Sequence, residues 1–246
     1  MKQGGVEGLH AVVTGGGSGI GAAIAQQLLA AGARVTVMGR NVERLKAFAD
    51  YQPIDVGDEA SVRVAFAAID AVDILVNNAG QVETAPLKST SLELWQRMLT
   101  VNLTGTFLCS REVATGMAER GFGRIINVAS TAALGGYAYV AAYCAAKHGV
   151  LGLTRALALE LAKKGVTVNA VCPGYTETDI IERSVATVVA KTGRSAGEAK
   201  AGFAASNPLG RLIQPAEVAS AVLWLARRDS GAMNGQAIPV CGGETA

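Results

Sequence analysis

Apolar residues recur along the chain in short runs, and most runs are followed by a stretch with helical periodicity. The runs predict buried strands at 9–13, 34–38, 51–56, 74–76, 125–129, 166–171 and 237–240. Helices are expected between them, at 22–31, 41–49, 59–71, 92–120, 143–164 and 217–226. Alternating strands and helices are typical of an α/β fold with a parallel sheet. We therefore expect a single-domain, doubly wound (Rossmann) parallel sheet flanked by helices.

Composition limits the partners that the chain is expected to have. Its 246 residues are enough for one sizeable core, so one domain spanning 1–246 is the simplest organisation. The net charge is +2 with interspersed charges, which favours neither nucleic acid nor a membrane surface as a partner. The apolar runs are too short for a membrane span, and no secretory pattern opens the chain. Scattered cysteines (Cys109, Cys144, Cys172, Cys241) and two histidines predict a reduced, cytoplasmic protein without a metal site.

A glycine-rich turn, Thr14-Gly-Gly-Gly-Ser-Gly-Ile-Gly21, lies between the first strand and the first helix. Glycines let backbone amides approach a pyrophosphate, whose charge suits a helix N-terminus. A flexible loop would explain the run taken alone, but its position between strand and helix favours dinucleotide binding.

The end of the second strand bears on the choice of cofactor. NAD-binding relatives of this fold carry an acidic residue there, whereas this chain has Gly39 followed by Arg40. The arginine suits a 2′-phosphate, so NADP(H) is favoured over NAD(H). The alternative is a surface arginine without a ligand.

Polar and small residues gather where the predicted strands end. These are Thr14, Arg40, Asp55, Asn78, Ser130 and Pro173. In open α/β sheets ligands bind beyond the carboxyl ends of the strands. The convergence predicts one site at that edge.

Tyr143 and Lys147 are four residues apart, so a helix places them on one face. A nearby ammonium group favours phenolate, and we expect it to lower the tyrosine pKa so that the phenol can exchange a proton with a carbonyl or alcohol oxygen. Ser130, at a strand end, is placed to hydrogen-bond the same oxygen. Each feature has an alternative explanation. Tyr143 and Lys147 could be a packed ring beside a solvated lysine, and Ser130 could be only a cap at the strand end.

Two further regions, Asn102 and residues 177–205, have a composition that calls for an explanation. Asn102 lies in the middle of a long predicted helix, where asparagine is unfavourable unless the position is a loose surface one. Residues 177–205 are polar and alanine-rich, and we interpret them as a mobile helical flap over the site. Thr187, Val188, Val189 and Phe203 suggest a partly apolar pocket there. The flap's basic residues (Arg183, Lys191, Arg194, Lys200) could meet a carrier phosphate, although a solvated face explains them better.

Over its whole length the chain resembles the short-chain dehydrogenase/reductases. The motifs that carry the resemblance are Thr14-Gly-x-x-x-Gly19-x-Gly21, Asn77-Asn78-Ala79-Gly80, Asn102, Ser130, Tyr143-x-x-x-Lys147 and Pro173-Gly174. The second half, through 123–130, 147–150, 168–174 and 237–243, is most similar to bacterial ketoreductases of the 3-oxoacyl and aromatic-polyketide kind. The region 41–73 is shorter than is usual in the family, which implies trimmed walls on the adenine side.

The resemblance assigns roles to the residues. It implies that Tyr143 is the general acid/base, that Ser130 polarises the carbonyl, and that Lys147 binds the nicotinamide ribose and lowers the tyrosine pKa. Asn102 would hold a water that links Lys147 to solvent. The implied cofactor contacts are Gly15, Gly17, Ser18, Gly19, Ile20, Gly21, Arg40, Asp55, Val56, Asn78, Ala79, Gly80, Tyr143, Lys147, Pro173, Gly174, Thr176 and Thr178. The family is commonly tetrameric through the helices around Asn102 and Tyr143, so a homotetramer is expected.

The expected activity is therefore NAD(P)H-dependent interconversion of a ketone and a secondary alcohol. A 3-oxoacyl thioester and a polyketide-like or cyclic ketone are both candidate substrates. The alternatives are an NAD-linked catabolic alcohol dehydrogenase of the hydroxyacyl type and, more remotely, a non-catalytic dinucleotide-binding regulator. An epimerase or dehydratase fits less well, because such chains carry a larger C-terminal substrate domain.

Overall fold

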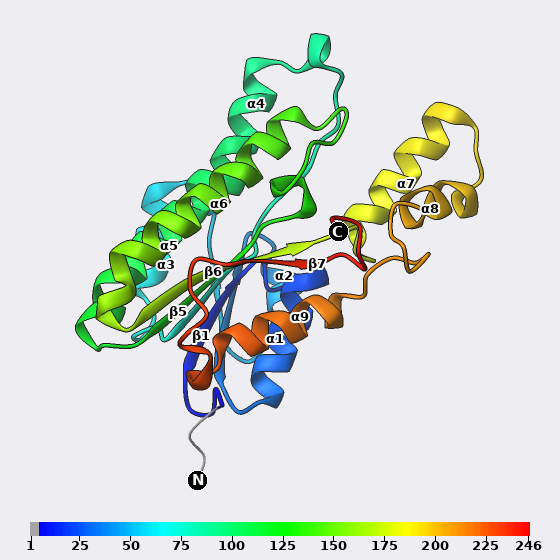
Figure 1. Ribbon diagram of the computed structural model, residues 1–246. Helices are drawn as coiled ribbons and strands as arrows, with labels where there is room; N and C mark the ends of the chain where they lie inside the picture. The colour runs from blue at the N-terminus through cyan, green and yellow to red at the C-terminus, as the bar shows by residue number, and fades with distance from the viewer. Residues whose placement is uncertain (1–4) are drawn as a thin grey trace.

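The structure, a computed structural model, describes residues 5–246 and contains one sheet of seven parallel strands in that range (Figure 1). Residues 1–4, on which the expectation about a secretory signal partly depends, lie outside the described range. The strands are β1 (His10–Thr14), β2 (Arg34–Gly39), β3 (Tyr51–Pro53), β4 (Ile74–Asn77), β5 (Gly123–Val128), β6 (Val166–Pro173) and β7 (Ala237–Val240). Their order is β3-β2-β1-β4-β5-β6-β7. The predicted doubly wound sheet is confirmed.

Helices cover both faces of the sheet, as Figure 1 shows. One face packs against α1 (Gly19–Ala30) and α9 (Pro215–Ala226), and the other against α3 (Glu59–Ala67), α5 (Gly105–Glu119) and α6 (Ala141–Leu161). Because strand side chains alternate, β1 serves both cores: Ala11 and Val13 join the α1/α9 core, and Val12 joins the α3/α5/α6 core. Strands buried on both faces explain why the sequence shows short apolar runs rather than alternation.

The strand order reverses its direction of growth between β1 and β4. A crevice at such a switch point is where ligands bind in open α/β sheets. Thr14 ends β1 and Asn77 ends β4, so the glycine turn and the Asn77-Asn78-Ala79-Gly80 segment meet there. This topology positions the site.

The adenine side of the sheet is shorter than the sequence pattern predicted. The helix expected at 41–49 is the single turn α2 (Val42–Leu45), and the strand expected at 51–56 ends at Pro53. The Asp55 carboxylate accepts a bond from Gly57 N (2.9 Å), which turns the chain toward α3. The helix expected to end at Ala71 ends at Ala67.

The long helix expected at 92–120 has a different turn in its middle. It consists of α4 (Leu92–Leu99), a π-helical segment labelled η2 (Thr100–Thr104) and α5. Single π turns inside α-helices often mark functional positions. Asn102 lies in this turn and is buried, so the surface alternative for that residue is wrong.

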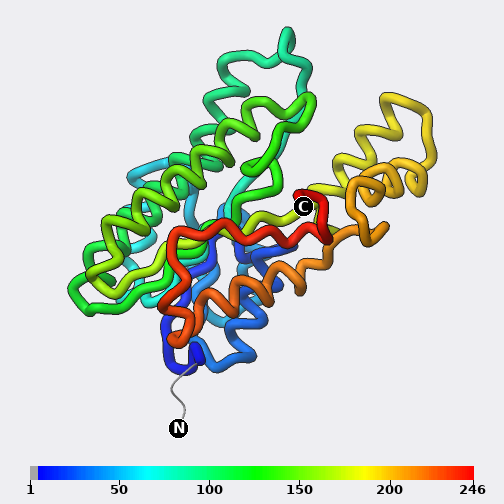
Figure 2. Tube along the Cα trace, in the orientation of Figure 1, coloured from blue at the N-terminus to red at the C-terminus, as the bar shows by residue number. Residues whose placement is uncertain are grey.

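Residues 177–205 form two helices, α7 (Asp179–Thr192) and α8 (Ala196–Ala204), which project from the body as an arm (Figures 1 and 2). The C-terminus ends beside the start of this arm, as Figure 2 shows. The short 3₁₀ segments are η1 (Leu87–Ser89), η3 (Thr131–Ala133), η4 (Ala162–Lys164) and η5 (Arg228–Ser230). No helix within the described residues is long and apolar enough to cross a membrane.

Candidate active site

The glycine turn starts α1 and leaves its first turn open to an anion. Gly15 and Gly19 adopt positive φ angles of 65° and 51°, which favour glycine. A Cβ on Gly21 would lie 2.2 Å from Gly15 O. Ser18, the N-cap, makes no side-chain cap bond, and the first turn of α1 has no acidic residue. The amides at this helix start, which no side chain caps, and the helix dipole therefore fit the pyrophosphate of a dinucleotide.

Asn78 and Thr14 hold this turn against β4. The Asn78 side chain donates to Thr14 O (3.0 Å) and Gly15 O (3.2 Å), while Thr14 Oγ1 accepts from the amides of Asn78 and Ala79 (3.0 Å each). A Cβ on Gly15 would lie 2.9 Å from Asn78 Nδ2. The Nδ2 group of Asn78 is thus bound to the protein and fixes the side chain against the glycine turn.

Other predicted cofactor residues lie at the same edge of the sheet. Arg40 follows β2, is exposed, and makes no side-chain hydrogen bond or ion pair with another residue of 5–246. Asp55 and Val56 follow β3, and Val56 is buried against Gly105. Thr178 precedes α7, and its Cγ2 lies 3.2 Å from where a Cβ on Gly19 would be. The segment that holds Pro173, Gly174, Thr176 and Thr178 therefore reaches back over the glycine turn.

The Ser130 hydroxyl and the Tyr143 phenol interact with one another. Ser130 Oγ accepts a hydrogen bond from Ala132 N (3.1 Å) and so caps η3, which agrees with the alternative interpretation of Ser130 as a cap at the strand end. Its own proton remains available to the Tyr143 phenol, and this interaction acts to lower the phenol's pKa. The cap and the contact with Tyr143 are therefore made by the same hydroxyl.

Burial outweighs the interaction with Ser130 and raises the pKa of Tyr143 to about 12. Lys147, four residues along α6, has its Nζ 5.6 Å from the centre of the Tyr143 ring and donates to Val128 O (2.8 Å). Lys147 is itself buried, and burial lowers its pKa to about 8. The prediction that the Tyr143 pKa is lowered is therefore wrong for the protein without a bound ligand. The spacing of the two residues indicates the nearby ammonium group, but it does not indicate that the phenol is buried.

Asn102 braces the chain beside Lys147. Its Nδ2 donates to Met98 O and Gln81 O (2.9 Å each), and its Oδ1 accepts from Gln81 N (3.2 Å). A Cβ on Gly80 would lie 2.8 Å from Asn102 Oδ1 and 3.7 Å from Lys147 Nζ. Only a glycine leaves this space between the two side chains clear. One lone pair of Oδ1 remains for any further partner.

A chain of buried polar side chains, which we call the polar wall, continues from Asn102 beneath the site. Thr106 donates to Asn102 O (3.0 Å), and Ser110 donates to Thr106 O (2.7 Å). Asn77 Nδ2 donates to Ser110 Oγ and to Asn127 Oδ1, and Asn127 donates to Thr154 (2.9 Å). The polar wall consists of Asn77, Asn102, Thr106, Ser110, Asn127 and Thr154. It ties β4 and β5 to α5 and α6, the helices that carry the site. Sequence reasoning missed Thr106, Ser110, Asn127 and Thr154, whose residue types are common in any helix or strand.

Aromatic and acidic side chains line the arm side of the site. The Tyr137 hydroxyl lies 2.8 Å from Thr131 Oγ1 and 2.5 Å from Glu244 Oε1, and burial raises the pKa of Tyr137. Glu244 Oε2 is buried without a partner among the described residues and would lie 2.7 Å from a Cβ on Gly174. The ring of Tyr175 meets Tyr137 (6.2 Å) and Phe203 of α8 (5.1 Å). Of the apolar flap residues, Phe203 is thus the one tied to the site through ring contacts.

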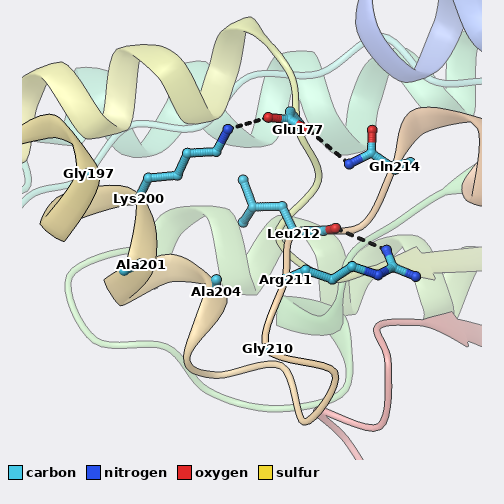
Figure 3. Close-up of a pocket in the computed structure, with 9 residues that line it drawn as sticks. All are labelled: Glu177, Gly197, Lys200, Ala201, Ala204, Gly210, Arg211, Leu212 and Gln214. Atoms are coloured by element: carbon cyan, nitrogen blue, oxygen red, sulfur yellow. Dashed lines mark hydrogen bonds and ion pairs between the residues drawn. The ribbon is translucent and has the colours of Figure 1, made fainter.

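A pocket of about 390 Å³ opens between α8 and the segment 210–214 (Figure 3). Its charged groups are committed to one another: Glu177 binds Lys200 and Gln214 (2.9 Å), and Arg211 forms a bidentate pair with Glu217 (2.8 Å). Lys200 therefore has a carboxylate partner in place of a carrier phosphate. The pocket lies beside the arm, not at the Ser130 and Tyr143 hydroxyls.

Residues 9–188 match the model of the short chain dehydrogenase family. The chain belongs to that family. As a short chain dehydrogenase it is an oxidoreductase that acts on CH–OH groups and their carbonyl products, and its glycine turn fits the nicotinamide dinucleotide that the family uses.

Known members of this short chain dehydrogenase family align with nearly the whole chain. The protein named as ketoacyl reductase 1 of the granaticin polyketide synthase in Streptomyces violaceoruber is 43% identical, covering 95% of this chain and 92% of the relative. An acetoacetyl-CoA reductase of Rhizobium meliloti is 40% identical, and the alignment covers 95% of this chain and 97% of the reductase. A crystal structure of a variant actinorhodin polyketide ketoreductase with NADPH superposes with a TM-score of 0.93 at 40% identity, covering 97% of each chain.

Proposed function

We propose that this chain is an NADPH-dependent ketoreductase whose substrate is a 3-oxoacyl thioester or a polyketide-like cyclic ketone. The observation that carries the proposal is the meeting of Ser130, Tyr143 and Lys147 at the carboxyl edge of the sheet, next to a glycine turn that fits a dinucleotide. The names of the relatives support the substrate class.

In this proposal the Tyr143 phenol is the proton donor for carbonyl reduction. With a pKa of about 12 it keeps its proton at neutral pH, which suits a general acid. Ser130 would donate a hydrogen bond to the carbonyl oxygen, since its hydroxyl is held by Ala132 N and directed at the phenol. When bound, the nicotinamide would provide the hydride for the carbonyl carbon, and the Tyr143 phenol would donate the proton to the oxygen.

Lys147 and Asn102 would complete the proton path. A phenolate left after proton donation is stabilised by the Lys147 ammonium beneath the ring. We propose that Lys147 also holds the nicotinamide ribose, and that the free lone pair of Asn102 holds a water through which the proton is replaced. The space that Gly80 leaves between these two side chains supports that path.

The preference for NADP(H) is supported by the end of β2. β2 ends at Gly39, so the strand end carries no carboxylate that would repel a 2′-phosphate. The guanidinium of Arg40, the next residue, makes no hydrogen bond or ion pair with another described residue. The glycine turn adds helix amides for the pyrophosphate. We propose that Gly15 to Gly21, Arg40, Asp55, Val56, Asn78 to Gly80 and 173–178 together hold the cofactor.

Two wider proposals accompany this one. Exposed apolar side chains on α4, α5 and α6 (Leu92, Trp95, Phe107, Leu159) support association through these helices into a homotetramer. Four thiols that form no disulfide support a reducing, cytoplasmic location. Light scattering after size exclusion tests the first, because the tetramer predicts about four times the monomer mass of 25.1 kDa.

The decisive experiment compares NADPH and NADH oxidation over a panel of 3-oxoacyl thioesters and bicyclic ketones. Thioester or bicyclic ketone turnover with NADPH supports the proposal and the role of Arg40. A preference for NADH would favour the catabolic alcohol dehydrogenase alternative. If the protein binds the dinucleotide but turns over no ketone of the panel, the result would favour the alternative that it is a non-catalytic dinucleotide-binding regulator.

A further inference from the structure

An ion pair connects the adenine side of the site to the arm. Arg44 Nη1, on α2, lies 2.7 Å from Oδ2 of Asp179, the first residue of α7. The two residues are 135 positions apart in the sequence. About half of each side chain is exposed (52% and 49%), so solvent and ligands reach the pair. We call this pair the clasp.

The clasp lies beside the glycine turn. Arg44 Cβ is 3.1 Å from where a Cβ on Gly17 would be, and Thr178, next to Asp179, makes the corresponding 3.2 Å approach to Gly19. Thus α2 and the residue before α7 both contact the glycine turn, and the clasp joins the two helices beside it. Any larger residue at Gly17 would push against α2, which explains why that position is a glycine.

Charge suggests what the clasp responds to. Arg44 lies four residues after Arg40, on the short helix α2 that follows the end of β2, so both arginines belong to the segment that leaves this strand. A phosphate monoester carries close to two negative charges at neutral pH and accepts bidentate bonds from arginine. Asp179 offers Arg44 a single negative charge at an exposed position, where ion pairs are weak. A phosphate near Arg40 therefore competes effectively for Arg44.

We propose that Arg44 is a second ligand for the adenosine 2′-phosphate, that Asp179 competes with the phosphate for it, and that NADP(H) but not NAD(H) opens the clasp and frees the start of α7. The inference rests on the proposed function in one respect, namely that the dinucleotide lies on the glycine turn. It adds a residue that reads the phosphate and a link from the cofactor to the arm.

Titration calorimetry of NADPH and NADH with the full-length protein tests this without relying on turnover. Asp179→Asn is expected to tighten NADPH binding by up to about fivefold, because it removes the competitor, and to leave NADH binding unchanged. Arg44→Gln is expected to weaken NADPH binding by about tenfold or more and to leave NADH unchanged. In Arg44→Gln/Asp179→Asn the gain from the asparagine should disappear.

Matched controls isolate the clasp from helix effects. Glu182→Gln removes the other acidic residue in the first turn of α7, and Lys46→Gln removes a neighbouring exposed charge paired with Glu43. Neither should change the ratio of NADPH to NADH affinity by more than about twofold. Thermal unfolding of each variant verifies that it is folded.

The outcomes separate this inference from the proposed function. If Asp179→Asn weakens both cofactors alike, the clasp is only a structural tie and the inference is overturned. If Arg40→Gln weakens NADPH binding and Arg44→Gln does not, the NADP(H) proposal stands and the clasp inference fails. Opposite effects of the Arg44 and Asp179 variants on NADPH support the inference even if no ketone on the panel is reduced.

Discussion

The two sides of the site are held by different kinds of interaction. The polar wall, which runs from Asn102 beneath the site, consists of side chains that are at most 6% exposed and joined by hydrogen bonds of 2.7 to 3.0 Å. The arm is tied to the body mainly by exposed polar contacts, the ion pair of Arg44 with Asp179 and the hydrogen bond that Gln214 donates to Glu177, and by the ring contact of Phe203 with Tyr175.

This difference separates the chemistry from the access to it. Breaking a buried hydrogen bond leaves an unsatisfied group and costs about 1–3 kcal/mol, so the residues around Tyr143 keep one arrangement. Exposed ion pairs contribute little and are easily exchanged, so the arm can move without disturbing the wall. Segments that move on ligand binding are generally drawn from the less stable parts of a fold.

The largest expected effect is on the wall side, at the proposed proton donor. Tyr143→Phe should reduce ketone turnover by about 10²–10⁴-fold, because it removes the general acid but keeps the ring. Cofactor affinity should change little. Steady-state NADPH oxidation and calorimetry measure the two effects, with Tyr139→Phe, an exposed tyrosine, as the matched control. Turnover at the wild-type rate in Tyr143→Phe would rule out the mechanism.

The next effect is a pH dependence set by Lys147. Because its pKa is lowered to about 8, the ammonium is lost as pH rises through that value, and ketone reduction should fall by up to about tenfold per pH unit above it. In Lys147→Arg, which stays charged, the fall should disappear. A wild-type rate that stays level from pH 7 to 9 would contradict this role.

The same titration should not unfold the protein. The folded pKa of Lys147 lies below the ordinary value of 10.5, so between pH 8 and 9 the unfolded chain binds more protons at this residue. This group therefore makes the protein more stable as pH rises through that window. Thermal unfolding at pH 8 and 9 distinguishes lost catalysis from lost structure.

A pair of serines compares the two sides directly. Ser110 and Ser184 each donate to the carbonyl four residues earlier, at 2.7 and 2.9 Å, but Ser110 belongs to the polar wall and Ser184 to the arm. Ser110→Ala leaves one N–H of Asn77 unsatisfied and should lower the free energy of unfolding by about 1–3 kcal/mol. Ser184→Ala should change it by less than about 0.5 kcal/mol. Equal effects in denaturant titrations would contradict the difference between wall and arm.

The sequence was sufficient for the fold and for the gathering of residues at the carboxyl edge of the sheet. Buried parallel strands appear in the sequence as short apolar runs between helices. The ends of two of these runs place Thr14 and Asn77 at the carboxyl edge of the sheet. It was less reliable for segment ends, as at β3, because a three-residue strand and a turn have similar composition. It also left the place of Asn102 open, since a π turn has no distinctive pattern of its own.

Contacts between distant segments and effects of burial could not be predicted from spacing. The clasp joins residues 135 positions apart, and Tyr137 meets Glu244 across 107 positions. No periodicity signals such pairs. The tyrosine pKa was predicted in the wrong direction for a related reason: the i, i+4 spacing shows the lysine, whereas the burial of both groups depends on how the whole chain folds around them.

Hydrogen exchange followed by mass spectrometry tests the contrast between wall and arm most directly. We predict that amides of α7 and α8 exchange at least about 100-fold faster than those of β4 and β5, since exposed ion pairs permit local opening and the polar wall does not. Protection of α7 and α8 equal to that of β4 and β5 would show that the arm is as firmly held as the wall, and would contradict the account.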